Sequence, residues 1–448
     1  MRVHFIAIGG AAMHNLALAL HEKSYLVTGS DDSIFNPSKS RLENAGICPD
    51  LFGWFPEKIT KEIDSVIVGM HARANNPELL KAQELGLSIY SYPEYLYEQS
   101  KNKTRIVIGG SHGKTTITSM ILHVLQKLSI ECDYMVGAQL AGFTTMVKLS
   151  DAPIIVLEGD EYLSSPIDLR PKFHLYKPHI ALISGIAWDH INVFPTFENY
   201  LSQFEIFINK IEPQGYLTYC STDSELNEIA DVNPLISTEA YKLPFYKIVD
   251  GKTFVEFEDT LIPLQIFGEH NLMNMMGALN ICKQLKVSEL DFLNAMSTFS
   301  GASRRLEKIF EREGLQVFKD FAHSPSKVSA TVQAVKNQFK GFTIIAALEL
   351  HTFSSLNKTF LAEYKNTMDG VDCAIVYFDP EAVAHKKLED LSEAVVFDSF
   401  ARSDLNVLSK SADVCNLVRS EVSNNTIVLL MSSGNFGGLV LEDFAQSL

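Results

Sequence analysis

Short apolar runs alternate along this chain with longer stretches in which apolar residues recur every three or four positions. The short runs are typical of strands buried on both faces, and the longer stretches are typical of amphipathic helices. Their alternation predicts a parallel sheet with helices on its faces. In the first hundred residues the expected strands lie at 3–8, 25–32, 65–70 and 87–92, with a helix over 12–22.

Two further blocks follow the polar stretch 98–104, which we interpret as a linker. The second block has apolar runs at 105–108, 153–157 and 179–184, helices at about 115–128 and 271–285, and short, antiparallel strands within 245–267. The third block has strands at 315–320, 342–348, 373–378 and 426–431 with helices between them. The chain is therefore predicted to form three α/β domains, over residues 1–100, 101–298 and 299–448.

The composition is that of a globular protein, with 448 residues, 46% hydrophobic and 21% charged, and a net charge of −16. This acidic balance argues against a nucleic-acid partner. No apolar run approaches the roughly 20 residues that a membrane span needs. The six cysteines show no C-x-x-C spacing, so we expect reduced thiols in a cytoplasmic protein. We expect a monomer or weak homo-oligomer.

The stretch "VIGGSHGKTTITSMI" at 107–121 resembles a phosphate-binding loop that is one residue shorter than the common G-x-x-x-x-G-K-[ST] pattern. A strand precedes it and a helix follows it, so backbone N–H groups and the helix N-terminus would face an anion. Lys114 is expected to contact the terminal phosphates, and Thr115 to offer a hydroxyl to magnesium. The alternative is a glycine turn with an incidental lysine.

Acidic residues follow the next two apolar runs. Glu158, Asp160 and Glu161 come after 153–157, and Asp189 and His190 come after 179–184. Because ligands of open parallel sheets bind at the carboxyl ends of the strands, these side chains are expected beside the loop. Carboxylate oxygens suit magnesium. Taken singly, each acid is more simply a solvated strand end, and His190 a hydrogen-bonded turn residue.

Polar residues of the later segments supply further candidates. Asn271 and Asn274 lie three apart on one face of a helix, where their amides suit an adenine edge, although asparagine also caps helices. Arg304 and Arg305 stand in a glycine-started turn that suits phosphate. Asp320 and His323 directly follow a predicted strand.

Together these patterns resemble the Mur ligase family, whose members form amide bonds with ATP during peptidoglycan assembly. The matching stretches, in family order, are "GGSHGKTT" (109–116), Glu158, "WDH" (188–190), "HNLMN" (270–274), "GASRR" (301–305) and "KDFAH" (319–323). The resemblance implies a Rossmann-like N-terminal domain that binds a UDP-sugar, a P-loop-type central ATPase domain, and a Rossmann-like C-terminal domain that binds the incoming peptide and closes on ATP.

The resemblance also implies ATP and Mg²⁺ as cofactors and assigns roles to individual residues. The implied catalytic residues are Lys114, Glu158, His190, Arg305 and Asp320. The implied ATP-binding residues are Gly110, Ser111, His112, Gly113, Lys114, Thr115, Thr116, Asn271, Asn274, Arg305, Asp320 and His323. The implied metal ligands are Thr115, Glu158 and His190.

The N-terminal stretch "HFIAIGGAAM", followed by "GSDD", resembles the subgroup that acts on UDP-N-acetylmuramate. It is a poor dinucleotide fingerprint, since Ala7 replaces the first glycine. The implied UDP-sugar-binding residues are Gly9, Gly10, Ala11, Met13, Ser30, Asp31 and His71. Branches that add later amino acids carry a carbamoylated lysine shortly after the magnesium histidine. Phe204 stands there instead, which favours the early-acting subgroup.

The acceptor is expected to be a murein peptide. "EGDEY" at 158–162 and "RPKFHLYKP" at 170–178 resemble the recycling branch, which joins L-Ala-γ-D-Glu-meso-diaminopimelate to UDP-N-acetylmuramate, and Tyr162, Arg170 and Lys172 could line its acceptor cleft. Against this, Thr352 and Ser355 stand where arginines are usual.

Three alternatives stay open. One is ligation of L-alanine, and another is a nucleotide-dependent binding protein without ligase activity. The third is a folate-polyglutamate type of ligase, against which residues 1–100 argue.

Overall fold

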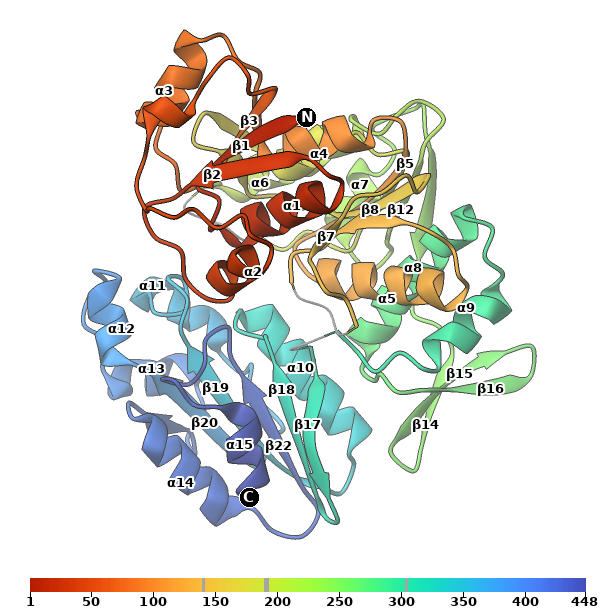
Figure 1. Ribbon diagram of the computed structural model, residues 1–448. Coiled ribbons are helices and arrows are strands. Elements are labelled where there is room, and N and C mark those ends of the chain that lie inside the picture. The colour runs from red at the N-terminus through yellow and green to blue at the C-terminus, as the bar shows by residue number, and fades with distance from the viewer. Residues whose placement is uncertain (139–141, 189–192, 303–304) are drawn as a thin grey trace. The chain divides into compact units, whose positions relative to one another are not determined.

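The computed structural model describes residues 1–138, 142–188, 193–302 and 305–448 (Figure 1). They divide into two compact units. The first consists of Met1–Lys242 and Asn274–Ala295, and the second of Leu243–Met273 and Met296–Leu448. The three domain bounds derived from the sequence stay predictions.

The N-terminal part of the first unit is a four-stranded parallel sheet in the order β2-β1-β3-β4. Its strands are β1 (Arg2–Ile6), β2 (Leu26–Ser30), β3 (Ser65–Val68) and β4 (Ile89–Ser91). Its helices are α1 (Ala11–Glu22), α2 (Ser38–Asn44), the 3-10 helix η1 (Pro56–Lys58), α3 (Pro77–Glu84) and α4 (Tyr92–Ser100). The strand expected over 87–92 is shorter, because Ser91 and Glu94 form a capping box that starts α4 at Tyr92.

The rest of the first unit is built on a seven-stranded sheet in the order β13-β12-β11-β5-β8-β6-β7. Its strands are β5 (Thr104–Gly109), β6 (Asp133–Met135), β7 (Val147–Lys148), β8 (Ile154–Glu158), β11 (Ile180–Ile183), β12 (Tyr216–Cys220) and β13 (Ser237–Tyr241). Within this sheet the described strands pair in parallel, except that β7 pairs with β6 in an antiparallel manner. A separate antiparallel pair, β9 (Leu163–Ser165) and β10 (Asp168–Pro171), follows β8. Since β5 pairs with both β8 and β11, the carboxyl ends of these three buried strands meet at one edge.

The remaining helices of the first unit connect these strands. They are α5 (Lys114–Lys127), η2 (Lys172–Leu175), α6 (Phe197–Ile208) and α7 (Ser224–Ile229). Helices α8 (Glu269–Gln284) and α9 (Glu289–Met296) each belong partly to both units. No helix among the described residues is long and apolar enough to cross a membrane.

The second unit contains the antiparallel sheet β14-β15-β16, as predicted for 245–267, and a six-stranded sheet in the order β17-β18-β22-β19-β20-β21. The strands are β14 (Tyr246–Val249), β15 (Lys252–Phe257), β16 (Thr260–Leu264), β17 (Glu307–Arg312), β18 (Leu315–Asp320), β19 (Thr343–Leu350), β20 (Cys373–Phe378), β21 (Asn406–Leu408) and β22 (Thr426–Met431). The helices are α10 (Pro325–Gln338), α11 (Lys358–Leu361), η3 (Ala362–Tyr364), α12 (Pro380–His385), α13 (Glu393–Phe400), α14 (Ser411–Glu421) and α15 (Leu441–Gln446).

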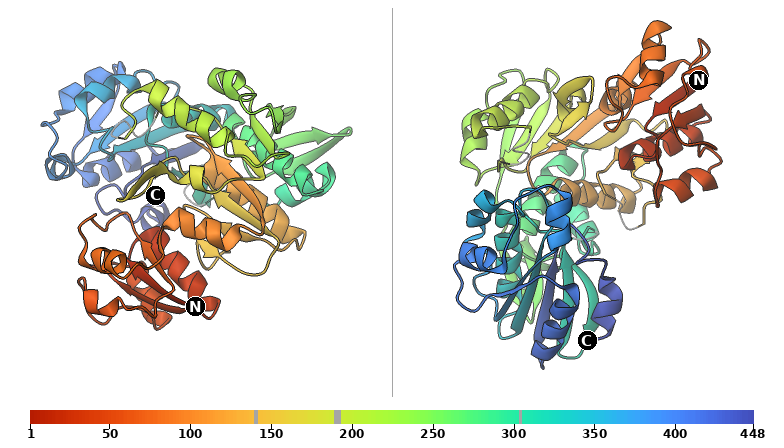
Figure 2. Two further views of the ribbon diagram at one scale, coloured as in Figure 1. Left: turned by 90° about the horizontal axis from the view of Figure 1, so that it is seen from above. Right: turned by 90° about the vertical axis from the view of Figure 1, so that its left-hand side faces the viewer.

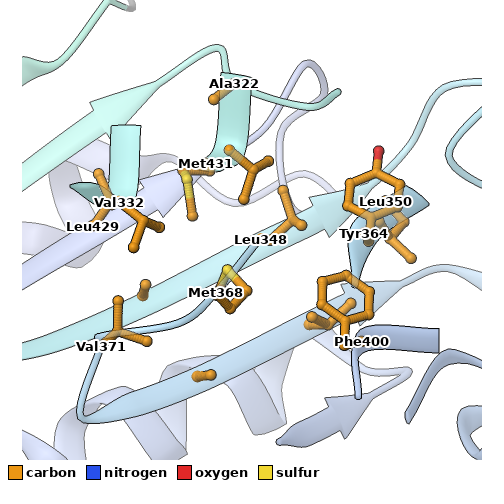
Figure 3. Close-up of a cluster of buried hydrophobic side chains, with 14 of the residues drawn as sticks. Ala322, Val332, Leu348, Leu350, Tyr364, Met368, Val371, Phe400, Leu429 and Met431 are labelled. Carbon is orange, nitrogen blue, oxygen red and sulfur yellow. The ribbon is translucent and has the colours of Figure 1, made fainter. Parts of the chain in front are cut away.

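Helices cover both faces of the six-stranded sheet (Figure 2). On one face, Leu348 and Leu429 belong to a buried cluster that includes Val332 of α10 and Phe400 of α13 (Figure 3). The opposite face packs against α14 and α15. Because the strands alternate their side chains between two buried faces, they contain the near-continuous apolar runs from which the sequence predicted them.

Candidate functional site

The phosphate-loop candidate connects β5 to α5 through two glycines with positive φ, Gly110 at +120° and Gly113 at +78°. A Cβ atom added at Gly110 would lie 2.2 Å from Ser184 Oγ, and one added at Gly113 would lie 2.4 Å from Asn274 Oδ1. Both positions therefore require glycine. The N-cap residue of α5 is Gly113, which has no side chain with which to cap the helix. The first N–H groups of an α-helix have no partner within the helix, so binding of an anion at the start of α5 stays a prediction.

His112 and Thr116, two further residues of the predicted loop, lie at this turn. The carbonyl oxygen of His112 accepts a hydrogen bond from Ser184 Oγ, while its ring Nδ1 lies 2.7 Å from the Ser111 carbonyl oxygen. Thr116 is buried in the first turn of α5. The loop is thus tied to the end of β11 as well as to its own helix.

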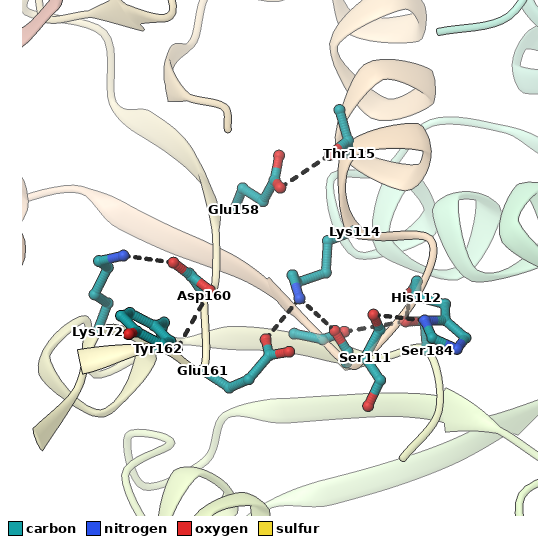
Figure 4. A network of polar contacts seen from close by, with 12 residues as sticks. Ser111, His112, Lys114, Thr115, Glu158, Asp160, Glu161, Tyr162, Lys172 and Ser184 are labelled. Atoms are coloured by element: carbon teal, nitrogen blue, oxygen red, sulfur yellow. Dashed lines mark hydrogen bonds and ion pairs between the residues drawn. The ribbon is translucent and has the colours of Figure 1, made fainter. Parts of the chain in front are cut away.

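Lys114 is the first residue of α5, and its side chain points towards the loop that precedes the helix (Figure 4). Nζ donates to the Gly110 carbonyl oxygen at 2.7 Å and to Glu161 Oε2 at 2.6 Å. Burial by itself lowers the pKa of Lys114, but the carboxylates of Glu161 and Asp160 outweigh it and hold the pKa above its ordinary value. The lysine is therefore a largely buried positive charge at the end of the loop, where α5 begins.

Glu158 ends β8 beside the loop, because Ile108 of β5 pairs with it in the sheet. Thr115 Oγ1 donates to Glu158 Oε1 at 2.9 Å, and the Gly137 N–H donates to Oε2 at 2.9 Å. Burial raises the pKa of this carboxyl, while Gly137 and Lys114 act in the opposite direction. The structure thus brings together two of the three predicted metal ligands.

The donor set of Thr115 and Glu158 fits magnesium. A hydroxyl and a carboxylate supply the hard oxygen atoms that this ion prefers, and a nearby cation would offset the cost of burying the carboxylate. Among the described residues no group of three His, Cys, Asp or Glu side chains is placed to hold a metal. The predicted third ligand, His190, lies outside the described residues, as does Asp189.

A chain of hydrogen bonds that the sequence did not predict runs behind the loop. The Ala187 N–H donates to Ser111 Oγ at 2.9 Å, and Ser111 Oγ lies 2.8 Å from the hydroxyl of Tyr200 on α6. The Tyr200 hydroxyl in turn donates to Glu161 Oε1 at 3.1 Å. Tyr200 and Glu161 are almost completely buried. No local pattern could have revealed Tyr200, since it lies 89 residues from Ser111.

The two asparagines proposed for adenine lie in different compact units. Asn274 faces Gly113, as the space around that glycine shows. Asn271 is buried, and its Nδ2 donates to the Phe267 carbonyl oxygen one turn earlier, at 2.9 Å. A contact of either amide with adenine stays a prediction.

In the second unit, Asp320 ends β18 and is buried. Its carboxylate accepts the N–H groups of Leu306 at 2.7 Å and Ala322 at 2.6 Å. Burial raises the pKa of this carboxyl, and the charge of Arg305 acts in the opposite direction. His323 Nδ1 lies 2.8 Å from the carbonyl oxygen two residues before it. The structure thus places Arg305 and Asp320 near each other, whereas Arg304 lies outside the described residues.

The proposed UDP-sugar residues gather at the carboxyl edge of the N-terminal sheet. The Gly9 N–H donates to Asp31 Oδ2 at 2.7 Å, and a Cβ atom at Gly9 would lie 2.9 Å from that oxygen. Gly10 precedes α1, and Ala7 adopts φ +70° where a dinucleotide fingerprint would have glycine. The other members are Ala11 and Met13 at the start of α1, Ser30 at the end of β2 and the exposed His71 after β3.

The residues proposed for the acceptor cleft are held by neighbouring carboxylates. Arg170 Nη2 lies 2.7 Å from Asp168 Oδ2 and 2.9 Å from Glu94 Oε1. Lys172 pairs with Asp160, and its Nζ lies 5.8 Å from the centre of the Tyr162 ring. An acceptor carboxylate would have to compete with these partners.

Thr352 and Ser355, which replace the usual arginines, form a local turn. Thr352 Oγ1 donates to Ser355 Oγ at 2.9 Å, and the Ser355 N–H donates to Thr352 Oγ1 at 3.1 Å. Ser355 is completely buried. These two hydroxyls form a hydrogen bond with each other. They cannot replace a guanidinium group as the partner of a carboxylate.

Comparison with known proteins covers nearly the whole chain. Residues 2–104 match the family model "Mur ligase family, catalytic domain", residues 108–282 match "Mur ligase middle domain", and residues 304–434 match "Mur ligase, glutamate ligase domain". UDP-N-acetylmuramate–L-alanine ligase of Clostridium kluyveri is 32% identical over 383 residues, which are 82% of this chain and 81% of the relative. The ligase of the same name from Sulfurihydrogenibium sp. is 29% identical over 97% of this chain and 95% of its own.

Solved structures show the same fold. UDP-N-acetylmuramate-alanine ligase of Thermotoga maritima matches with a TM-score of 0.73 at 19% identity, over 100% of this chain and 99% of that one. A murein peptide ligase of Psychrobacter arcticus matches with a TM-score of 0.64 at 23% identity, over 100% and 98%. The chain belongs to the Mur ligase family and is an ATP-dependent, ADP-forming amide ligase.

Proposed function

We propose that this ligase joins the lactyl carboxylate of UDP-N-acetylmuramate to the amino group of L-alanine. The observation that supports the chemistry is the cluster of Lys114, Thr115 and Glu158 at the carboxyl edge of one parallel sheet. The donor sugar is the one in the names of the relatives that match across most of the chain. ATP and UDP-sugars are cytoplasmic metabolites, which favours a cytoplasmic enzyme.

A carboxylate does not react with amines at neutral pH, so the reaction needs a better leaving group. A lactyl oxygen attacks the γ-phosphorus of ATP, the bond to the β-phosphate oxygen breaks, and ADP leaves. The neutral amine then attacks the acyl carbon, the bond to the phosphate oxygen breaks, and the amine proton passes to solvent or a base. One phosphate and one ADP are released for each amide formed.

The protein contributes mainly position and charge. The backbone N–H groups at the start of α5 and the ammonium of Lys114 would neutralise the phosphoryl oxygens. Thr115 and Glu158 would hold magnesium, which neutralises phosphate charge when bound. His190 is proposed as a further ligand, and Arg305 and Asp320 as ATP contacts from the second unit.

The acceptor has two candidates. Relatives that are 29% and 32% identical bear the name of an L-alanine ligase. These names support L-alanine as the acceptor more strongly than the murein peptide that was expected from the sequence. The tripeptide L-Ala-γ-D-Glu-meso-diaminopimelate is the second candidate, because "EGDEY" and "RPKFHLYKP" resemble the recycling branch. A large acceptor also offers remote contacts that can orient its amine.

Competition at equal concentrations separates the two acceptors. Phosphate release and the mass of the product are measured with UDP-N-acetylmuramate, ATP and both acceptors. L-Alanine is expected to show the higher kcat/KM. A higher value for the tripeptide would replace this assignment with the recycling reaction. ADP release that requires neither acceptor nor UDP-N-acetylmuramate would contradict ligation altogether.

A further inference from the structure

The partner of Lys114 in this structure is a carboxylate that no step of the proposed reaction uses. The side chains of Lys114 and Glu161 are only 14% and 1% exposed, and Nζ lies 2.6 Å from Oε2. A buried lysine without a counter-charge is costly, so Glu161 stabilises the loop when no phosphate is present. Lys114 Nζ, which contacts Glu161 in this structure, is also the atom that we expect to contact the phosphates of a bound nucleotide.

Glu161 is held in place from its other side. Its Oε1 accepts the hydrogen bond of Tyr200, and the ring of Tyr200 packs against Phe204 and Phe194 at centroid distances of 5.2 Å and 5.5 Å. The preceding residue, Asp160, is fixed by an ion pair with Lys172. Glu161 is therefore held by Tyr200 as well as by Lys114.

We propose that Glu161, held by Tyr200, is the resting counter-ion of the phosphate-loop lysine, and that nucleotide binding exchanges this carboxylate for phosphate oxygens on Lys114 Nζ. The inference rests on the proposed nucleotide site. When nucleotide is bound, the Glu161 carboxylate and the nucleotide phosphate both lie beside Lys114. Because these two negative charges repel each other, Glu161 lowers the affinity for nucleotide. Glu161 is a positioning residue and keeps the loop in its binding shape between turnovers.

The test measures the dissociation constant of ADP by calorimetry, with magnesium and with a chelator, on the full chain. Glu161→Gln keeps the shape of the side chain and removes its charge, so ADP is expected to bind about tenfold more tightly, since like charges in contact oppose binding. Glu161→Asp keeps the charge, so ADP is not expected to bind more tightly. A purely structural role predicts weaker binding for both.

The chain offers a matched control. Lys103 and Asp133 form an ion pair away from the loop, with a distance of 2.8 Å and side chains 11% and 0% exposed. Asp133→Asn removes the charge of an equally buried partner and should leave the ADP affinity unchanged. Tyr200→Phe retains the packed ring but removes the hydrogen bond that holds Glu161. We expect a smaller gain in ADP affinity for this variant. It serves as a second test if Glu161→Gln does not fold.

Each outcome separates this inference from the proposed function. If the wild type binds no ADP, the nucleotide site itself is wrong. If the wild type binds ADP and Glu161→Gln binds it equally or more weakly, only the exchange at Lys114 is wrong. If Glu161→Gln changes the magnesium dependence of ADP binding, Glu161 is a metal ligand and the inference is overturned.

Discussion

Lys114 has the clearest consequence at the scale of single residues. Its ammonium would lie at the terminal phosphates, where one charge contact to a transition state is worth about 10²–10³ in rate. Lys114→Ala is therefore expected to lower kcat/KM for ADP release by that factor, measured on variant protein that circular dichroism shows to be folded, since the substitution leaves the Glu161 carboxylate without its counter-charge. A variant within about threefold of the wild type would contradict the phosphate-loop assignment.

Glu158 is a test of magnesium binding. Glu158→Gln keeps the shape of the side chain and the contact with Thr115 but removes the charge that hard cations prefer. The variant should need more magnesium for half-maximal rate and turn over more slowly. Overlapping magnesium titrations of variant and wild type would show that Glu158 does not bind the ion.

His174 gives the chain a pH-dependent stability. Burial lowers its pKa to about 4, although its Nε2 donates to the Gln203 carbonyl oxygen at 2.8 Å. The unfolded chain, with a pKa near 6.5, takes up the proton first as the pH falls. Stability is therefore retained above pH 6.5 and lost towards pH 4, by about 2 kcal/mol between pH 7 and pH 5.

Chemical denaturation at these two pH values measures this loss. His174→Gln should reduce the difference between pH 7 and pH 5 by about 2 kcal/mol. The same substitution at the exposed His385 is the control and should leave the difference unchanged. An identical loss in the wild type and His174→Gln would show that other groups cause the pH dependence.

At the scale of elements, the junction of β5 and α5 depends on the backbone of Gly113. Alanine at this position would combine a positive φ with a Cβ atom 2.4 Å from Asn274 Oδ1. Gly46 also has a positive φ, but an added Cβ there has open space. Both substitutions should cost about 1–2 kcal/mol of stability from backbone strain. Only Gly113→Ala should also weaken ADP binding, and equal ADP affinities in the two variants would show that the loop tolerates the change.

At the scale of the whole molecule, the two compact units make simple two-state unfolding an unsafe assumption. Calorimetry with and without ADP is therefore more informative than a single melting temperature. At about one hundred times its dissociation constant, ADP should stabilise the unit with the loop by about 2.7 kcal/mol. Lys114→Ala should lose most of this shift, and an unchanged melting profile of the wild type with ADP would contradict nucleotide binding at the loop.

Much of the architecture could be predicted because it is encoded locally. Apolar runs buried on both faces predicted the main parallel strands, and the antiparallel segment within 245–267 was also confirmed. The glycine turn between β5 and α5 was predictable because glycines, lysine and a helix start occupy a few consecutive positions, whereas phosphate binding there stays a prediction. The end of the strand at 87–92 was wrong, because the capping box of Ser91 and Glu94 starts a helix inside an apolar run. The strands β6, β7, β9, β10 and β21 were missed, since two to four residues carry no clear pattern. The longer strands β12, β13 and β17 were not predicted either, and β13 and β17 contain several exposed polar residues.

The sequence alone determined the main parallel strands, most of the long helices and the position of the glycine loop between β5 and α5, because hydrophobic period and turn chemistry act over neighbouring residues. Only the tertiary structure decided which side chains meet at that loop. Glu158 reaches Thr115 across 43 residues, Glu161 reaches Lys114 across 47, and Tyr200 reaches Ser111 across 89. The order of strands in the sheet sets these contacts, which is why the ion pair on Lys114 could not be predicted from spacing along the chain.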